Sequence, residues 1–124
     1  MYDENRYCKV FISGLESREE VGRRVVGCLE PAIPGPANTI TSGIMRISVR
    51  KNDDYDKQLQ DRPSDGFLWY PFFLDVLPTN TAPQEEYVLQ IATLLRCLWD
   101  NGIKAVAACD FEEDLPAGGG KIRY

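Results

Sequence analysis

The segment CDFEEDLP, residues 109–116, places four carboxylates within five positions: Asp110, Glu112, Glu113 and Asp114. Clustered carboxylates can bind a divalent cation, transfer protons, or attract a positively charged partner. They can also simply solvate the end of an exposed strand and discourage aggregation between sheet edges. The residues in and around the segment indicate which of these four alternatives are favoured.

A calcium-binding loop alternates its oxygen ligands and contains a glycine that permits a sharp turn. Asp110, Glu112 and Asp114 do alternate, but the segment contains no glycine and Phe111 interrupts it. Acid–base catalysis requires a carboxyl group with a raised pKa in a dry pocket, whereas crowded carboxylates on a loop stay solvated. We therefore expect no metal site here. The segment, Glu113 included, is expected to contact a basic partner or to solvate the strand end.

The chain contains no histidine, which excludes Ser-His-Asp and Cys-His catalytic sets and the usual proton shuttle near neutral pH. Its four cysteines, Cys8, Cys28, Cys97 and Cys109, form no C-x-x-C pair, so a structural zinc site is not expected either. Each cysteine lies beside apolar residues, and all four are predicted to be reduced core residues. No cofactor is expected, and an enzyme ranks last among the functions considered.

The composition fits one globular domain of 124 residues. A net charge of −5 and a pI near 4.7 disfavour binding to nucleic acid and suit a basic protein partner. No apolar run approaches the length of about 20 residues that a membrane span requires. Because residues 1–10 are polar and acidic, unlike a signal peptide, a cytoplasmic location without membrane attachment is expected.

Hydrophobic periodicity predicts four strands and two helices. Alternating apolar residues indicate strands within 7–15, 38–53, 66–78 and 103–111. The first helix follows Ser17, because Ser17 and Glu20 match the capping-box spacing. The second helix is expected within 79–102. The polar residues 52–65 are predicted to form a loop. The glycine-rich residues 117–124 are predicted to form a flexible tail, which lies outside a single domain of residues 1–116.

This order of elements predicts an α+β fold of the ferredoxin-like type, β-α-β-β-α-β. Such a fold has a four-stranded antiparallel sheet with both helices on one face, and its first and third strands lie side by side in the centre. The opposite face of the sheet is then uncovered unless another segment folds over it.

Alternation along the third strand places Phe67, Trp69 and Phe73 on the uncovered face, next to Phe11 of the first strand. An aromatic patch of this size is larger than a monomer normally leaves in water. The patch predicts a homodimer interface, a partner or ligand surface, or a cover formed by the 52–65 loop or the tail.

Two segments resemble the short motifs of RNA-recognition domains: VFISGL, residues 10–15, and DGFLWYPF, residues 65–72. The resemblance implies that Phe11, Phe67 and Trp69 stack on the bases of single-stranded RNA. Asp65 stands where that motif has a basic residue, and the acidic chain makes nucleic acid the less favoured partner.

A small acidic domain with no catalytic set, an apolar face and a carboxylate cluster also resembles bacterial immunity proteins in physical type, without a shared motif. The resemblance implies a non-catalytic domain that binds and neutralises a basic toxin or nuclease domain. This function is expected first, with contacts from Asp110, Glu112, Glu113, Asp114 and the 52–65 loop. The alternatives are a small-ligand or regulatory domain that dimerises through its sheet face, and a single-stranded RNA-binding domain.

Overall fold

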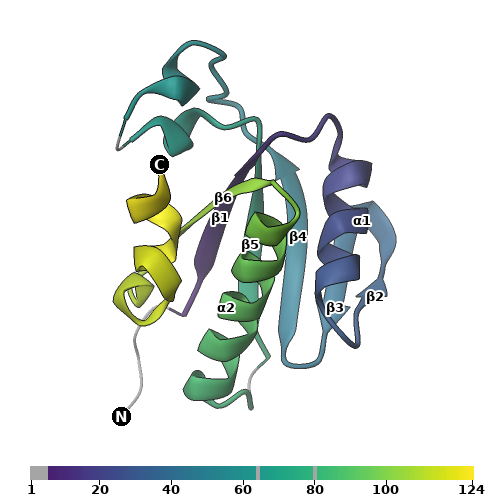
Figure 1. Cartoon of the computed structure of the whole chain (residues 1–124). Helices are drawn as coiled ribbons and strands as arrows, with labels where there is room; N and C mark the ends of the chain where they lie inside the picture. The colour runs from purple at the N-terminus through teal and green to yellow at the C-terminus, as the bar shows by residue number, and fades with distance from the viewer. Residues whose placement is uncertain (1–5, 64, 80) are drawn as a thin grey trace.

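The computed structural model describes residues 6–63, 65–79 and 81–124. It is a mixed α+β structure in which two α-helices cover one face of an antiparallel sheet (Figure 1). The strands are β1 (Cys8–Ser13), β2 (Ile33–Pro34), β3 (Thr39–Ser42), β4 (Met45–Lys51), β5 (Phe72–Pro78) and β6 (Lys104–Ala108). The helices are α1 (Arg18–Cys28) and α2 (Gln84–Asp100). Residues 1–5, which carry part of the expectation of a cytoplasmic location, lie outside the described residues.

The sheet has six strands in the order β2-β3-β4-β5-β1-β6, so the predicted four-stranded ferredoxin-like layout is wrong in its strand number. The α+β class and the antiparallel sheet are confirmed, and β1 pairs with β5 as expected for the first and third predicted strands. The added strands β2 and β3 continue the sheet beyond β4. Two residues of the proline-rich segment before residue 39 suffice for this pairing, because an edge strand tolerates proline.

Alternation along the strands divides their side chains between the two faces. Cys8, Val10 and Ile12 of β1 point toward the helices and are fully buried. Phe72, Leu74 and Val76 of β5 do the same, as their parity predicts. Helix α2 completes this core with Tyr87, Ile91, Leu94, Leu95 and Leu98.

Helix α1 begins as the capping box predicts. The Glu20 backbone N–H donates to Ser17 Oγ at 3.1 Å, while Glu20 Oε1 accepts the Glu16 N–H at 2.9 Å. The first bond satisfies a backbone donor of the first helical turn, and the second satisfies the N–H of the residue before the cap, one position earlier than in a standard capping box. The buried side chains of Val21 and Val25 lie on the face of α1 that packs against the core.

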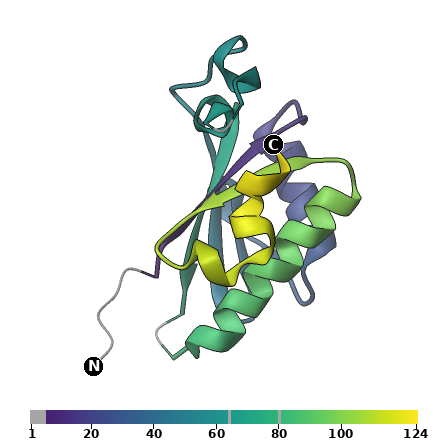
Figure 2. The ribbon, with the colours of Figure 1, turned by 60° about the vertical axis from the view of Figure 1, so that its left-hand side comes forward.

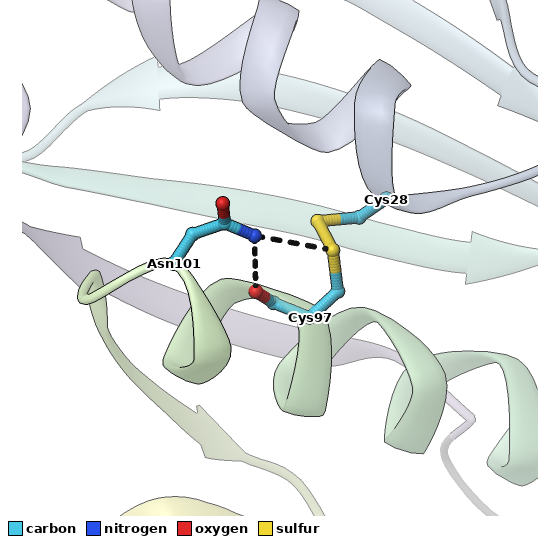
Figure 3. The surroundings of a disulfide bond; sticks show 3 residues. All are labelled: Cys28, Cys97 and Asn101. Atoms are coloured by element: carbon cyan, nitrogen blue, oxygen red, sulfur yellow. Dashed lines mark hydrogen bonds between the residues drawn. A yellow bond between two sulfur atoms is a disulfide. The ribbon is translucent and has the colours of Figure 1, made fainter.

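A disulfide joins Cys28 at the end of α1 to Cys97 of α2, with their Cα atoms 5.6 Å apart (Figure 3). The prediction that all four cysteines are reduced is therefore wrong for this pair. Their spacing in the sequence does not indicate the bond, because the two cysteines are 69 positions apart and only the packing of α1 on α2 brings them together. Disulfides are most common in oxidising compartments. The cytoplasmic location consequently stays a prediction.

The C-terminal segment Pro116–Arg123 is a 3-10 segment packed beside β6 rather than a separate flexible tail (Figures 1 and 2). Gly119 and Gly120 are buried and have positive φ angles of 83° and 107°. A Cβ atom on Gly119 would lie 2.7 Å from the Ala107 carbonyl oxygen, and one on Gly120 would lie 2.6 Å from that of Ala105. The glycines thus permit both the left-handed turn and its close approach to the edge strand.

The loop between β4 and β5 is anchored at its base by Asn52, which is buried. The Asn52 side-chain amide donates to the carbonyls of Leu68 and Tyr70 at 3.0 and 2.7 Å, and its backbone N–H donates to the Pro71 carbonyl. In Figures 1 and 2 this loop stands beyond one end of the sheet, near the C-terminus. None of the helices in the described part of the chain has the length and apolar character needed to cross a lipid bilayer.

Candidate functional site

The acidic segment forms a tight turn between β6 and the C-terminal segment, and residues Glu112–Asp114 make one turn of 3-10 helix. The side chains of Asp110, Glu113 and Asp114 are exposed, whereas Glu112 is half-buried. Leu115 is buried in the core cluster, and Phe111 packs partly against it. The apolar residues therefore fix the turn while most of its carboxylates face solvent.

Glu112 differs from the other acidic residues because both of its carboxylate oxygens are occupied. Oε2 accepts the backbone N–H of Cys109 at 3.1 Å, and Oε1 accepts Lys121 Nζ at 2.6 Å. Lys121 also lies 5.5 Å from the centre of the Phe67 ring. No local pattern in the sequence indicates this role of Lys121, because the glycine-rich segment that contains it is predicted to be flexible.

Three carboxylates remain available on the turn: Asp110, Glu113 and Asp114 have no ion-pair partner among the described residues. Within the same described ranges, no group of three or more His, Cys, Asp or Glu side chains is placed to hold a metal ion. The turn therefore presents a fixed, uncompensated negative charge.

The aromatic patch predicted on the sheet is organised differently from the expectation. Phe11 and Phe73 do lie on the face away from the helices, but β5 begins only at Phe72, so Phe67 and Trp69 are not on a strand. They belong to a 3-10 turn, Gly66–Trp69, of the loop that folds back onto the sheet. The prediction failed because Pro71 separates this turn from β5, and the apolar run hid the boundary.

Phe67 covers Phe11 directly. The two rings pack edge to face with centres 5.4 Å apart, and only 4% of Phe11 and 9% of Phe67 are exposed. Lys9 covers the neighbouring Phe73 ring, with its Nζ 4.2 Å from the ring centre. The sequence leaves open whether the aromatic patch is an interface, a ligand surface or a covered surface. Around Phe11, the chain's own loop covers the sheet face.

Beyond Phe73 the sheet face stays open and becomes polar. A shallow groove of about 620 Å³ follows β3, β4 and β5 there, lined among others by Tyr7, Arg46 and Asp75. Asp75 accepts hydrogen bonds from the Tyr7 hydroxyl and from the Arg50 guanidinium. Burial, together with the bond to Asp75, raises the pKa of Tyr7 well above its ordinary value. This surface is a paired polar network and not the expected aromatic platform.

The arrangement bears on the RNA-binding alternative. Base stacking requires exposed aromatic faces on the sheet. Here Phe11 and Phe67 pack edge to face against each other, and Trp69 lies under the Arg62 guanidinium, which is 5.5 Å from the ring centre. The three aromatic residues therefore do not form a free stacking surface.

A second concave surface lies on the helix side, between α1 and the β2–β3 hairpin. This groove has a volume of about 580 Å³, and most of its lining is apolar. Gly22, Val26 and Gly27 of α1 form one wall, while Pro34 and Ile40 belong to the other. The sequence did not indicate the groove, because the hairpin that bounds it was not predicted.

No known protein family matches the chain, and no curated protein or solved structure gives a significant match. The resemblances to immunity proteins and to RNA-recognition domains are therefore not tested by comparison.

Proposed function

We propose that this protein is a non-catalytic interaction domain that binds a basic protein surface through its acidic turn. The observation that carries the proposal is the fixed presentation of Asp110, Glu113 and Asp114, which are exposed and without ion-pair partners among the described residues. In its most concrete form the domain is an immunity-type protein that neutralises a basic toxin or nuclease domain.

Rigidity supports a binding role for the turn. The Glu112 carboxylate joins the Cys109 N–H to Lys121, and Leu115 is buried below it. A surface that is ordered before association loses less conformational entropy on binding. A strand end that needed only solvation would not require such a fixed backbone.

The net charge of the chain supports a basic partner. The chain has a net charge of −5, so the overall field and the turn attract the same sign of partner. Complementary charge accelerates association and suppresses binding to acidic surfaces. A basic active site, such as that of a nuclease, is the kind of surface that this turn fits.

The experiment compares proteins captured from the native cell by three immobilised forms of the chain. These are the wild type, the turn variant Glu113→Lys/Asp114→Lys, and the control Glu19→Lys/Glu30→Lys. The control reverses the same number of exposed charges around α1, which lies over β3 and β4 and away from β6 (Figure 1). Circular dichroism establishes that all three forms are folded.

We expect the wild type and the control to retain a basic protein at low salt. The turn variant should not retain it. Co-expression with that protein then tests neutralisation, because only the wild type and the control should protect the cell. If the turn variant retains the same proteins as the wild type, the acidic turn is not the binding surface.

A second candidate function, binding of a small apolar ligand, is favoured by the groove between α1 and the β2–β3 hairpin. Ligand sites are typically apolar clefts of roughly 300–1,000 Å³. The variant Gly22→Leu fills this groove, and Thr93→Leu adds the same side chain at an exposed position of α2. If the groove binds apolar ligands, Gly22→Leu alone abolishes binding of a fluorescent apolar probe. Equal probe binding by both variants would exclude the groove.

A further inference from the structure

Cys8 and Cys109 form a second cysteine pair, which carries no disulfide. The register of β1 and β6 pairs Lys9 with Ala108 and Val10 with Ala107, so one further step sets Cys8 opposite Cys109. Cys8 is fully buried, whereas Cys109 is partly exposed at the start of the acidic turn. One thiol is thus partly accessible, and the other is buried on the neighbouring strand.

The two thiols lie on neighbouring strands and influence each other's pKa. Hydrogen bonding between the two thiols has the largest effect on both pKa values, and the Phe111 backbone N–H also acts on Cys109. The bond to Cys109 raises the pKa of Cys8, and burial raises it further. The same bond lowers the pKa of Cys109, and the Phe111 N–H lowers it as well. The accessible cysteine is therefore the better nucleophile of the two.

The strand geometry also permits a bond between these sulfur atoms. Residues opposite each other in an antiparallel pair have Cα atoms about 4.5–5.5 Å apart. Disulfides form at Cα separations of about 4.4–6.8 Å. The Cα separation expected from the strand register is therefore compatible with a Cys8–Cys109 bond.

The charges around the pair select its reaction partner. Glu112 and Asp110 oppose the negative charge of the Cys109 thiolate, although Lys121 offsets part of the Glu112 charge. On the helix side, the uncharged hydroxyl of Tyr87 donates to the Arg6 carbonyl, and the Arg6 guanidinium lies over the Tyr87 ring. Glu113 and Asp114 add exposed negative charge one turn away. An approaching cation is favoured over an anion.

We propose that Cys8 and Cys109 are a thiol–disulfide exchange site that reacts with cationic disulfides. Cys109 is the attacking residue and Cys8 is the resolving residue. The site is separate from the proposed binding function, since it requires no protein partner.

The reaction consumes one external disulfide. The Cys109 thiolate attacks one sulfur of that disulfide, which forms a mixed disulfide and releases the first external thiolate. The Cys8 sulfur then attacks the Cys109 sulfur, and the proton of the Cys8 thiol passes to the second external sulfur as that group leaves. The mixed disulfide breaks and releases the second external group as a thiol. The two protein thiols are oxidised to a disulfide, and the external disulfide is reduced to two thiols.

The experiment incubates the folded wild-type protein with cystamine, a cationic disulfide, or with glutathione disulfide, which is anionic. Peptide mapping by mass spectrometry without reduction separates a Cys8–Cys109 bond from the existing Cys28–Cys97 bond. The wild type should form the Cys8–Cys109 bond, whereas Cys8→Ala should accumulate a stable mixed disulfide at Cys109. Because the wild-type measurement needs no variant, it stays valid even if Cys8→Ala does not fold.

The charge selectivity gives a second readout. Cystamine should react about tenfold faster than glutathione disulfide at low salt, and the ratio should approach one at high salt. Absence of the Cys8–Cys109 bond after cystamine treatment would overturn the exchange site. Equal rates for the two disulfides at low salt would overturn its preference for cationic partners.

Discussion

Lys121 donates from Nζ to Glu112 Oε1 at 2.6 Å, and this ion pair joins the C-terminal segment to the acidic turn. The same ammonium group lies 5.5 Å from the centre of the Phe67 ring. The acidic turn and the aromatic residues of the β4–β5 loop, which are far apart in the sequence, therefore share one contact residue.

The two roles of Glu112 can be separated by substitution. Glu112→Gln keeps an oxygen acceptor for the Cys109 N–H but loses the ion pair, whereas Glu112→Ala loses both. We expect Gln to lower the free energy of unfolding by less than about 1 kcal/mol, because the pair is partly exposed, and Ala to lower it by about 1 kcal/mol more. Chemical denaturation measures both values. Equal stabilities of the two variants would show that the Cys109 bond contributes nothing.

Substitution of glycine by alanine is predicted to have opposite effects in the C-terminal segment and in α1. Gly120→Ala should lower the free energy of unfolding by about 1–3 kcal/mol, because its φ is +107° and the new methyl group meets the Ala105 carbonyl. Gly22→Ala in α1 is the matched control, since its methyl group meets nothing within 4 Å. It should raise stability by about 0.5–1 kcal/mol. Thermal unfolding of the two variants tests the contrast, and a neutral Gly120→Ala would mean that the segment does not pack on β6.

The disulfide between the helices predicts a stability difference that depends on reductant. The double variant Cys28→Ala/Cys97→Ala should be less stable than the oxidised wild type by about 2–4 kcal/mol, because the bond closes a long loop in the unfolded chain. A mild reductant should bring the wild type close to the double variant and leave the variant unchanged. A wild type that does not respond to the reductant would argue that the bond is not formed in solution.

The cover over the sheet predicts the effect of removing Phe67. Phe67→Ala should lower stability by about 2–3 kcal/mol and expose residues 52–71 to proteolysis, because the loop loses its contact with Phe11. Light scattering then distinguishes cover from dimerisation. If the wild type is a dimer and the variant is a monomer of unchanged stability, the patch is an interface rather than a covered surface.

Local patterns in the sequence predicted the elements whose signals lie within a few residues. The Ser17–Glu20 cap, the alternation of β1 and the inward face of β5 from Phe72 to Val76 are of this kind. These signals do not depend on the rest of the fold, because capping and alternation are properties of neighbouring residues.

The features that the sequence did not predict depend on contacts between distant segments. The Cys28–Cys97 bond, the Lys121–Glu112 pair and the return of Phe67 onto Phe11 each join positions far apart in the chain. The glycine run at 118–120 was interpreted as flexibility, whereas its left-handed backbone packs against a strand edge. Composition alone does not distinguish these two uses of glycine.

The acidic turn is the central claim, and the association rate with the captured basic partner tests it most directly. The rate is measured at low and at physiological salt for the wild type, Glu113→Lys/Asp114→Lys and Glu19→Lys/Glu30→Lys. We predict that the turn variant associates at least about tenfold more slowly than the wild type at low salt, with a weaker salt dependence, and that the control changes far less. Equal association rates for the turn variant and the wild type would contradict the account.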